Sequence, residues 1–197
     1  MRQSVNGGNV DVKNLVEASL RKMLQTHSYE QITVSMICED SDIARKTFYS
    51  HFENKDAVVR GIFERDVIKP LRDTRSILPS DFRRKNAILL MRKLYDAILE
   101  DADFYYALVG PLKGKDDVFL RVATEAVYRF ASSISLGSSQ YQSAQEADYV
   151  AYYFASSQAM LLQKWISERY PVDAEVLASW YEKLAIGYWG KRFPDEE

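Results

Sequence analysis

The stretch from residue 32 to residue 59, ITVSMICEDSDIARKTFYSHFENKDAVV, constrains this chain more than any other segment. Thr33 can cap a short helix over residues 34–40 through its side-chain hydroxyl. Residues 42–44 then form a tight turn, and residues 45–52 form a second short helix. The pattern predicts a helix-turn-helix that is closed by the start of a further helix.

The second short helix of this motif has two unlike faces. Phe48 and Phe52 lie four residues apart and therefore share one face, where they can pack into a small core. Arginine and lysine side chains suit phosphates and guanine edges, and tyrosine and serine donate to phosphate oxygens. The opposite face combines these four residue types, as Arg45, Lys46, Tyr49 and Ser50. This face predicts contact with double-stranded DNA.

Lys55 lies in the first turn of the helix that follows the motif. Backbone N–H groups at the start of a helix already favour an anion. We therefore expect Lys55 to contact a DNA phosphate.

From Val12 to Val59 the chain resembles the DNA-binding domain of the TetR/AcrR family of transcriptional regulators. The strongest part of the resemblance is TFYSHF at residues 47–52, followed by Lys55, which fits the family pattern T-[FL]-Y-x-[HY]-F-x-x-K. Two positions depart from the pattern. Asp42 stands where the turn usually has glycine, and Ala44 stands where a capping serine or threonine is usual. The DNA-binding residues predicted from the pattern and the resemblance are Thr33, Ser35, Arg45, Lys46, Thr47, Tyr49, Ser50, His51 and Lys55.

The remainder of the chain has apolar residues at helical spacing and no sustained alternation of the kind found in strands, so we predict an all-α fold of about nine helices. Pro70 is expected to kink the long helix that follows the motif rather than end it. We expect a flexible arm over 1–10, a DNA-binding domain over 11–58 and an effector and dimerisation domain over 59–197. The expected helices outside the motif are 11–27, 56–78, 81–101, 102–109, 117–136, 146–169 and 173–189.

Composition excludes several other classes of protein. The chain has 197 residues, of which 47% are hydrophobic, so it can bury a substantial core. Its single cysteine, Cys38, excludes an internal disulfide, and no segment resembles a signal peptide or a membrane span, so we expect a cytoplasmic protein without a membrane partner. No phosphate loop, nucleophile arrangement or metal-ligand spacing is present, so we expect no catalytic residue, metal or cofactor.

The last two predicted helices carry apolar residues on more than one face, so each has one face for the core and one for a further partner. Small residues such as Ala155 and Ala159 would let another helix approach. We therefore expect a symmetric homodimer with a four-helix interface, which the family resemblance also implies. A plain monomeric core is the alternative. The predicted interface residues are Tyr149, Tyr153, Ala159, Trp180, Leu184 and Trp189.

The resemblance also implies a small effector molecule bound in the second domain. Aromatic side chains with polar tips suit an amphipathic effector. The alternative is that aromatic residues at helical spacing belong to the core. The candidate pocket residues are Tyr95, Phe104, Tyr105, Tyr128, Tyr152 and Trp165.

The sequence thus predicts a homodimeric, ligand-responsive DNA-binding regulator that acts as a repressor on a palindromic operator. A coactivator or protein-interaction module of the same fold, without direct operator binding, remains the alternative. Asp42, Ala44 and the equal numbers of acidic and basic residues over 1–60 keep that alternative open. A helical carrier of lipids or small molecules is a third class, which would need a large pocket.

Overall fold

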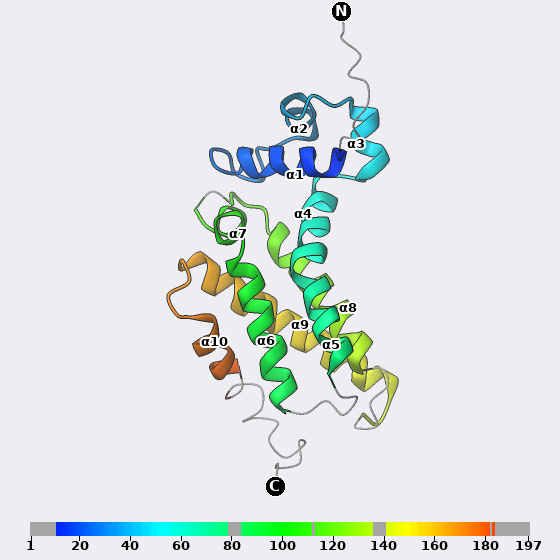
Figure 1. Cartoon of the computed structure of the whole chain (residues 1–197), viewed down its shortest axis with the longest axis vertical. Coiled ribbons are helices and arrows are strands. Elements are labelled where there is room, and N and C mark those ends of the chain that lie inside the picture. The colour runs from blue at the N-terminus through cyan, green and yellow to red at the C-terminus, as the bar shows by residue number, and fades with distance from the viewer. Residues whose placement is uncertain (1–10, 79–83, 112, 136–140, 182, 184–197) are drawn as a thin grey trace, which may run out of the picture.

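The computed structural model describes residues 11–78, 84–111, 113–135, 141–181 and 183 (Figure 1). Over these ranges the chain forms helices and connections but no strand, so the all-α prediction is confirmed. A small helical head lies at one end of the molecule, and a single long helical rod joins it to a larger helical body.

The head consists of α1 (Val12–Met23), α2 (Val34–Asp40) and α3 (Arg45–His51). α1 starts where the Asp11 carboxylate accepts a hydrogen bond of 3.1 Å from the backbone N–H of Lys13, and it packs across both α2 and α3. The side chains that meet between the three helices are fully buried, and they are Val16, Leu20, Ile37 and Phe48.

The rod is formed by α4 (Lys55–Phe63), the π-helical segment η1 (Glu64–Ile68) and α5 (Lys69–Ile77), which follow one another without a break. Pro70 has no N–H, and in a regular α-helix its ring would clash with the carbonyl group four residues earlier. The wider π turn immediately before it accommodates the ring, with Lys69 N–H bonded five residues back to Glu64. Pro70 therefore does not end the rod, as predicted.

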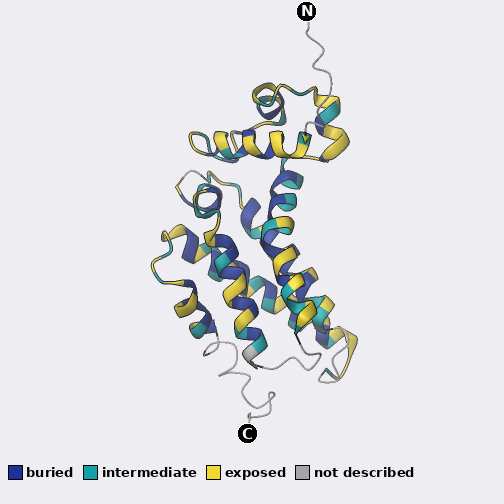
Figure 2. Ribbon diagram, in the orientation of Figure 1, coloured by how far each residue is buried: buried dark blue, intermediate teal, exposed yellow. Residues whose placement is uncertain are grey.

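The body contains α6 (Arg84–Leu99), α7 (Ala102–Val109), α8 (Val118–Ser135), α9 (Ala144–Ser167) and α10 (Ala174–Tyr181). α8 and α9 pack along each other, α10 packs on α6, and α4 packs on α8. The buried faces of these helices point toward one another, and the exposed faces point outward (Figure 2). The first residues of the helix expected over 81–101, and most of 182–197, lie outside the described residues.

In the ranges that the structure describes, no helix is both long enough and apolar enough to cross a membrane.

Candidate nucleic-acid interface

Local capping and turn chemistry place α2 and α3 as a helix-turn-helix. The Thr33 hydroxyl accepts a hydrogen bond of 3.3 Å from Met36 N–H and caps α2. Asp42 has a φ of 50°, so it occupies the left-handed backbone position that such a turn usually gives to glycine. Ala44 precedes α3 without any side-chain cap. The turn keeps its geometry with aspartate in place of glycine, and α3 starts without the usual cap.

The inner face of α3 is fixed by aromatic packing. Phe48 is fully buried and Phe52 is 7% exposed, and their ring centroids lie 5.6 Å apart. Ile37 of α2 is also fully buried in this core. The aromatic pair predicted from the four-residue spacing therefore holds α3 against the head.

The outer face of α3 carries exposed polar side chains. Tyr49 is 55% exposed, and its ring meets the edge of the Phe48 ring at 5.4 Å. The exposed polar residues on or beside this face are Ser35, Arg45, Lys46, Ser50 and His51. Thus five of the predicted site residues of α3, together with Ser35 at the start of α2, lie on accessible surface of the head.

Two hydrogen bonds orient side chains on this surface. The Arg45 guanidinium donates to the hydroxyl of Ser35, which ties the starts of α2 and α3 together. The Ser50 hydroxyl donates to the Thr47 carbonyl at 2.7 Å. Lys46 has no such contact within the described residues, so its ammonium is free to reach a phosphate or a base edge.

Lys55 does not lie where a phosphate ligand was expected. Its ammonium donates to the main-chain carbonyls of Tyr29 at 2.6 Å and Ile32 at 3.0 Å, and it lies 4.1 Å from the centre of the Tyr29 ring. Burial lowers the pKa of this ammonium, partly offset by nearby carboxylates led by Asp116. The structure thus gives Lys55 a role inside the protein, because it satisfies two carbonyls at the end of the turn after α1.

The six aromatic residues proposed for an effector pocket are not brought together. They fall into three ring pairs, Tyr95 with Trp165, Phe104 with Tyr105, and Tyr128 with Tyr152. The first two pairs are buried in the core, which was the alternative reading of these residues. In addition, the Tyr95 hydroxyl donates to the buried Gln158 amide at 2.9 Å.

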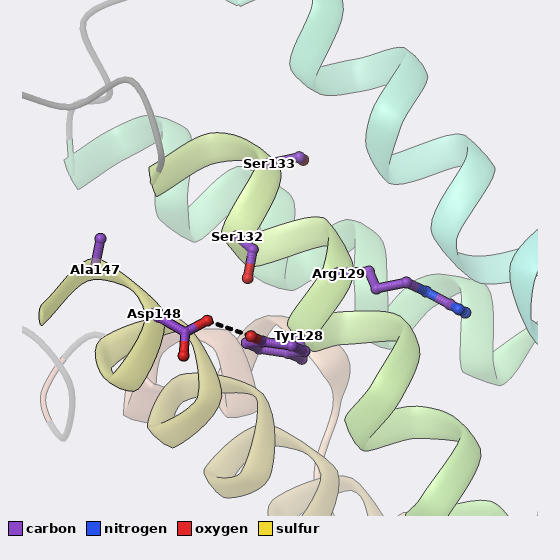
Figure 3. A pocket seen from close by; sticks show the side chains of 6 residues that line it. All are labelled: Tyr128, Arg129, Ser132, Ser133, Ala147 and Asp148. Atoms are coloured by element: carbon purple, nitrogen blue, oxygen red, sulfur yellow. Dashed lines mark hydrogen bonds between the residues drawn. The ribbon is translucent and has the colours of Figure 1, made fainter. Parts of the chain in front are cut away.

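A cavity of about 330 Å³ lies between the end of α8 and the start of α9. Tyr128 is the member of the predicted pocket set that lines it, and the Tyr128 hydroxyl donates to the Asp148 carboxylate across the cavity (Figure 3). That hydrogen bond raises the pKa of the Tyr128 hydroxyl. The remaining lining residues are Arg129, Ser132, Ser133 and Ala147.

The predicted dimer residues divide between surface and core. Tyr149 and Tyr153 of α9 are about two-thirds exposed, and Trp180 of α10 is also exposed. Ala159, in contrast, is fully buried, so its prediction as an interface residue is wrong. The row of small residues on α9 faces neighbouring helices of the same chain. Leu184 and Trp189 lie outside the described residues.

Sequence reasoning missed the charged side chains that tie the head to the body and to the rod. Arg21 of α1 bonds to Asp101 at 2.5 Å, and its guanidinium lies 4.5 Å from the centre of the Phe104 ring. Arg65 of η1 donates to the almost buried Glu17 carboxylate at 2.6 and 2.8 Å. Most of these partners are tens of residues apart in the sequence, so no local pattern could have paired them.

Comparison with known proteins identifies the head. The model of the family described as bacterial regulatory proteins, tetR family, matches residues 18–62. Over 113 residues the chain is 27% identical to the HTH-type dhaKLM operon transcriptional activator DhaS of Lactococcus lactis subsp. lactis (strain IL1403). This match covers 57% of the chain and 56% of that relative, so it spans only about half the length of each protein.

The whole fold also has a counterpart among solved structures. The structure of a dihydroxyacetone kinase operon activator, DhaS, superposes with a TM-score of 0.55 at 19% identity, and the alignment covers 91% of this chain and 97% of that one. At 19% identity, the superposition shows that the two proteins have similar folds. Residues 18–62, which include the helix-turn-helix, therefore resemble bacterial regulatory proteins of the tetR family, and the chain as a whole shares its all-α fold with the DhaS structure.

Proposed function

We propose that this regulator acts as a homodimer that reads a palindromic DNA operator with the outer face of α3. The observation that carries the proposal is the set of exposed cationic and hydroxyl side chains on this face, held by the buried aromatic pair beneath it. In helix-turn-helix proteins the second helix enters the major groove, and a two-fold dimer meets two half-sites one DNA turn apart.

The aromatic surface of α9 and α10 supports the homodimer. Its exposed large apolar side chains lie along these two helices, and they are Tyr149, Tyr152, Tyr153, Met160, Val176 and Trp180. Large exposed apolar patches on a regulator mark protein–protein contacts, and aromatic residues and methionine are enriched there. A two-fold contact of α9 and α10 with their copies would cover this surface with a four-helix interface.

We further propose that the protein responds to a small effector molecule. The cavity between α8 and α9 is the candidate site, because it offers a tyrosine ring, a carboxylate and two serine hydroxyls to an amphipathic molecule. The sign of regulation depends on where the operator lies relative to the promoter. The curated relative is named an activator, whereas the sequence alone led us to expect a repressor.

Lys46→Ala is expected to weaken operator binding about tenfold to a hundredfold, and to change the preferred base at one position of each half-site. Its ammonium is exposed on the outer face of α3 with no partner in the described part of the chain. Fluorescence anisotropy with a labelled duplex would measure the change. The matched control is Lys69→Ala, because Lys69 lies on α5 and pairs with Asp73 of the same helix at 2.8 Å. Equal affinities for both variants and the wild type would remove α3 as the reading helix.

Tyr153→Asp is expected to raise the dissociation constant of the dimer at least about tenfold, because a charge placed in the interface would be desolvated without a partner. Tyr153 is 63% exposed on α9. Sedimentation velocity over a range of protein concentrations would measure the dissociation constant. Ile77→Asp is the control, because Ile77 is an apolar residue on α5, outside α9 and α10, and is 83% exposed. A dimer unaffected by Tyr153→Asp would place the interface elsewhere.

A further inference from the structure

Two ion pairs link the connecting helix α4 to α8 at matching intervals. Asp56 of α4 accepts a hydrogen bond of 2.9 Å from the guanidinium of Arg121 on α8. One helical turn further along both helices, Arg60 of α4 lies 3.6 Å from the carboxylate of Glu125 on α8. Both pairs advance by four residues, so the two helices run in the same direction along this contact, which we name the α4–α8 charge ladder.

The order of the charges in the ladder is reversed from one rung to the next. On α4 the acid precedes the base, and on α8 the base precedes the acid. A slip of α4 by one helical turn, about 5.4 Å, would place Arg60 opposite Arg121 or Asp56 opposite Glu125. Either slipped arrangement brings like charges together, so the ladder favours one register of α4 on α8 over its neighbours.

The first rung also reaches into the head. The hydroxyl of the fully buried Tyr29, in the turn after α1, donates to the other oxygen of Asp56 at 2.6 Å. Burial alone would raise the pKa of the Asp56 carboxyl, but the hydrogen bonds from Tyr29 and Arg121 outweigh burial and lower it. The carboxylate therefore stays ionised at neutral pH, and it joins the turn after α1, the start of α4 and α8 at one point.

A second contact holds the same turn of the head from the body side. The backbone N–H of Lys115, in the loop before α8, donates to the Glu30 carboxylate at 3.1 Å. Gly114 has a φ of 73°, and a Cβ at this position would lie 2.9 Å from that carboxylate. The loop therefore approaches the head as closely as it does because residue 114 is glycine.

From this geometry we propose that Arg121 and the α4–α8 charge ladder are positioning elements for DNA reading, which fix the angle of the head on the body and thereby the spacing of the two reading helices. Arg121 lies on α8, in the body, and acts through Asp56 and Tyr29. The consequence for operator spacing rests on the proposed function, whereas the fixed head angle does not.

The head angle is tested first, without DNA. In a Cys38→Ser background, nitroxides are attached through Ala18→Cys on α1 and Ser167→Cys on α9, both exposed positions, and the labelled chains are diluted with unlabelled ones. Electron–electron double resonance should give one narrow distance distribution for the unaltered ladder and a broadened or shifted one for Arg121→Ala. Arg92→Ala is the matched control, because this exposed arginine pairs, among the residues that the structure describes, with Asp96 and Glu175 of the body. An unchanged distribution for Arg121→Ala overturns the proposal.

The second rung provides a rescue experiment. Glu125 also pairs with Arg129 of α8 at 2.9 Å, so the exchange is made in an Arg129→Ala background. There Arg60→Glu should broaden the distribution as Arg121→Ala does, and adding Glu125→Arg should restore the narrow distribution by exchanging the charges of the rung. Thermal unfolding shows whether Arg121→Ala folds. If it does not fold, Arg121→Gln takes its place in the experiment. If the distance distribution of the variant with both exchanges were as broad as that of Arg60→Glu, the pairing of charges would not set the angle of the head on the body. That result would overturn the proposal.

Operator spacing is the second readout. Arg121→Ala is expected to lower the preference for the best half-site spacing, relative to spacings one base pair longer or shorter, about threefold to tenfold, because the ion pairs of Arg121 with Asp56 and Asp116 are lost in each subunit. Affinity for an isolated half-site should stay unchanged. An equal loss of affinity for the isolated half-site would mean that Arg121 affects the contact of α3 with DNA directly, and it would overturn the proposal. If the unaltered protein selects no duplex, the proposed function fails, while the distance distributions still decide the head angle.

Discussion

Phe63→Ala is expected to lower the free energy of unfolding by about 3–5 kcal/mol, the usual cost of removing a buried aromatic ring. Phe63 is 1% exposed at the end of α4. Its ring meets the edges of Tyr105 on α7 and Phe119 on α8, with centroid distances of 6.2 and 6.3 Å. This cluster of rings packs the connecting rod against the body. Loss of the Phe63 ring therefore removes packing from three helices at once.

Urea unfolding at a fixed protein concentration would measure the effect of Phe63→Ala, because the stability of a dimer depends on concentration. Ile77→Ala is the control. Ile77 is 83% exposed on α5 of the same rod, so its truncation should change the free energy of unfolding by less than about 0.5 kcal/mol. A loss below about 1 kcal/mol for Phe63→Ala would contradict the close packing of this ring cluster.

Lys55→Met is expected to lower the free energy of unfolding by about 2–3 kcal/mol, because two main-chain carbonyls lose a charged donor and methionine cannot replace it. These carbonyls belong to Tyr29 and Ile32, in the turn that the head presents to the body. The same turn carries the Tyr29 hydroxyl that binds Asp56. The substitution should therefore loosen the head and its attachment together.

Lys46→Met is the matched control for Lys55→Met, and the two variants should separate stability from DNA affinity. Lys46 is exposed on α3, so its loss should leave the urea midpoint unchanged and weaken operator binding. If Lys55→Met instead unfolded like the wild type and reduced the salt dependence of binding by about one phosphate contact, the expectation of a phosphate ligand at Lys55 would be restored.

The helix-turn-helix could be predicted in detail because its signals are local. A capping threonine, two phenylalanines four residues apart and a turn residue that tolerates positive φ act within a few residues of each other, so the sequence carries them directly. The structure confirms the cap at Thr33 and the positive φ of Asp42. The continuous rod through Pro70 was predicted for the same reason.

Features that depend on residues far apart in the chain could not be predicted from the sequence. Arg121 and Asp56 are 65 residues apart in the chain, and nothing near either residue indicates the other. Lys55 was expected to face DNA because helix starts attract anions, but its ammonium donates to two main-chain carbonyls in the turn after α1. Ala159 shows a further ambiguity, because small residues admit any neighbouring helix, whether from the same chain or from a copy.

Direct reading of DNA by a dimer is tested by selecting ligands from a random duplex library at near-physiological salt. We expect enrichment of a palindrome whose half-sites lie about one DNA turn apart, bound with an affinity that falls steeply as salt rises. Enrichment of no duplex above background would contradict it, and would favour the coactivator alternative, in which the fold is kept and the partner is a protein.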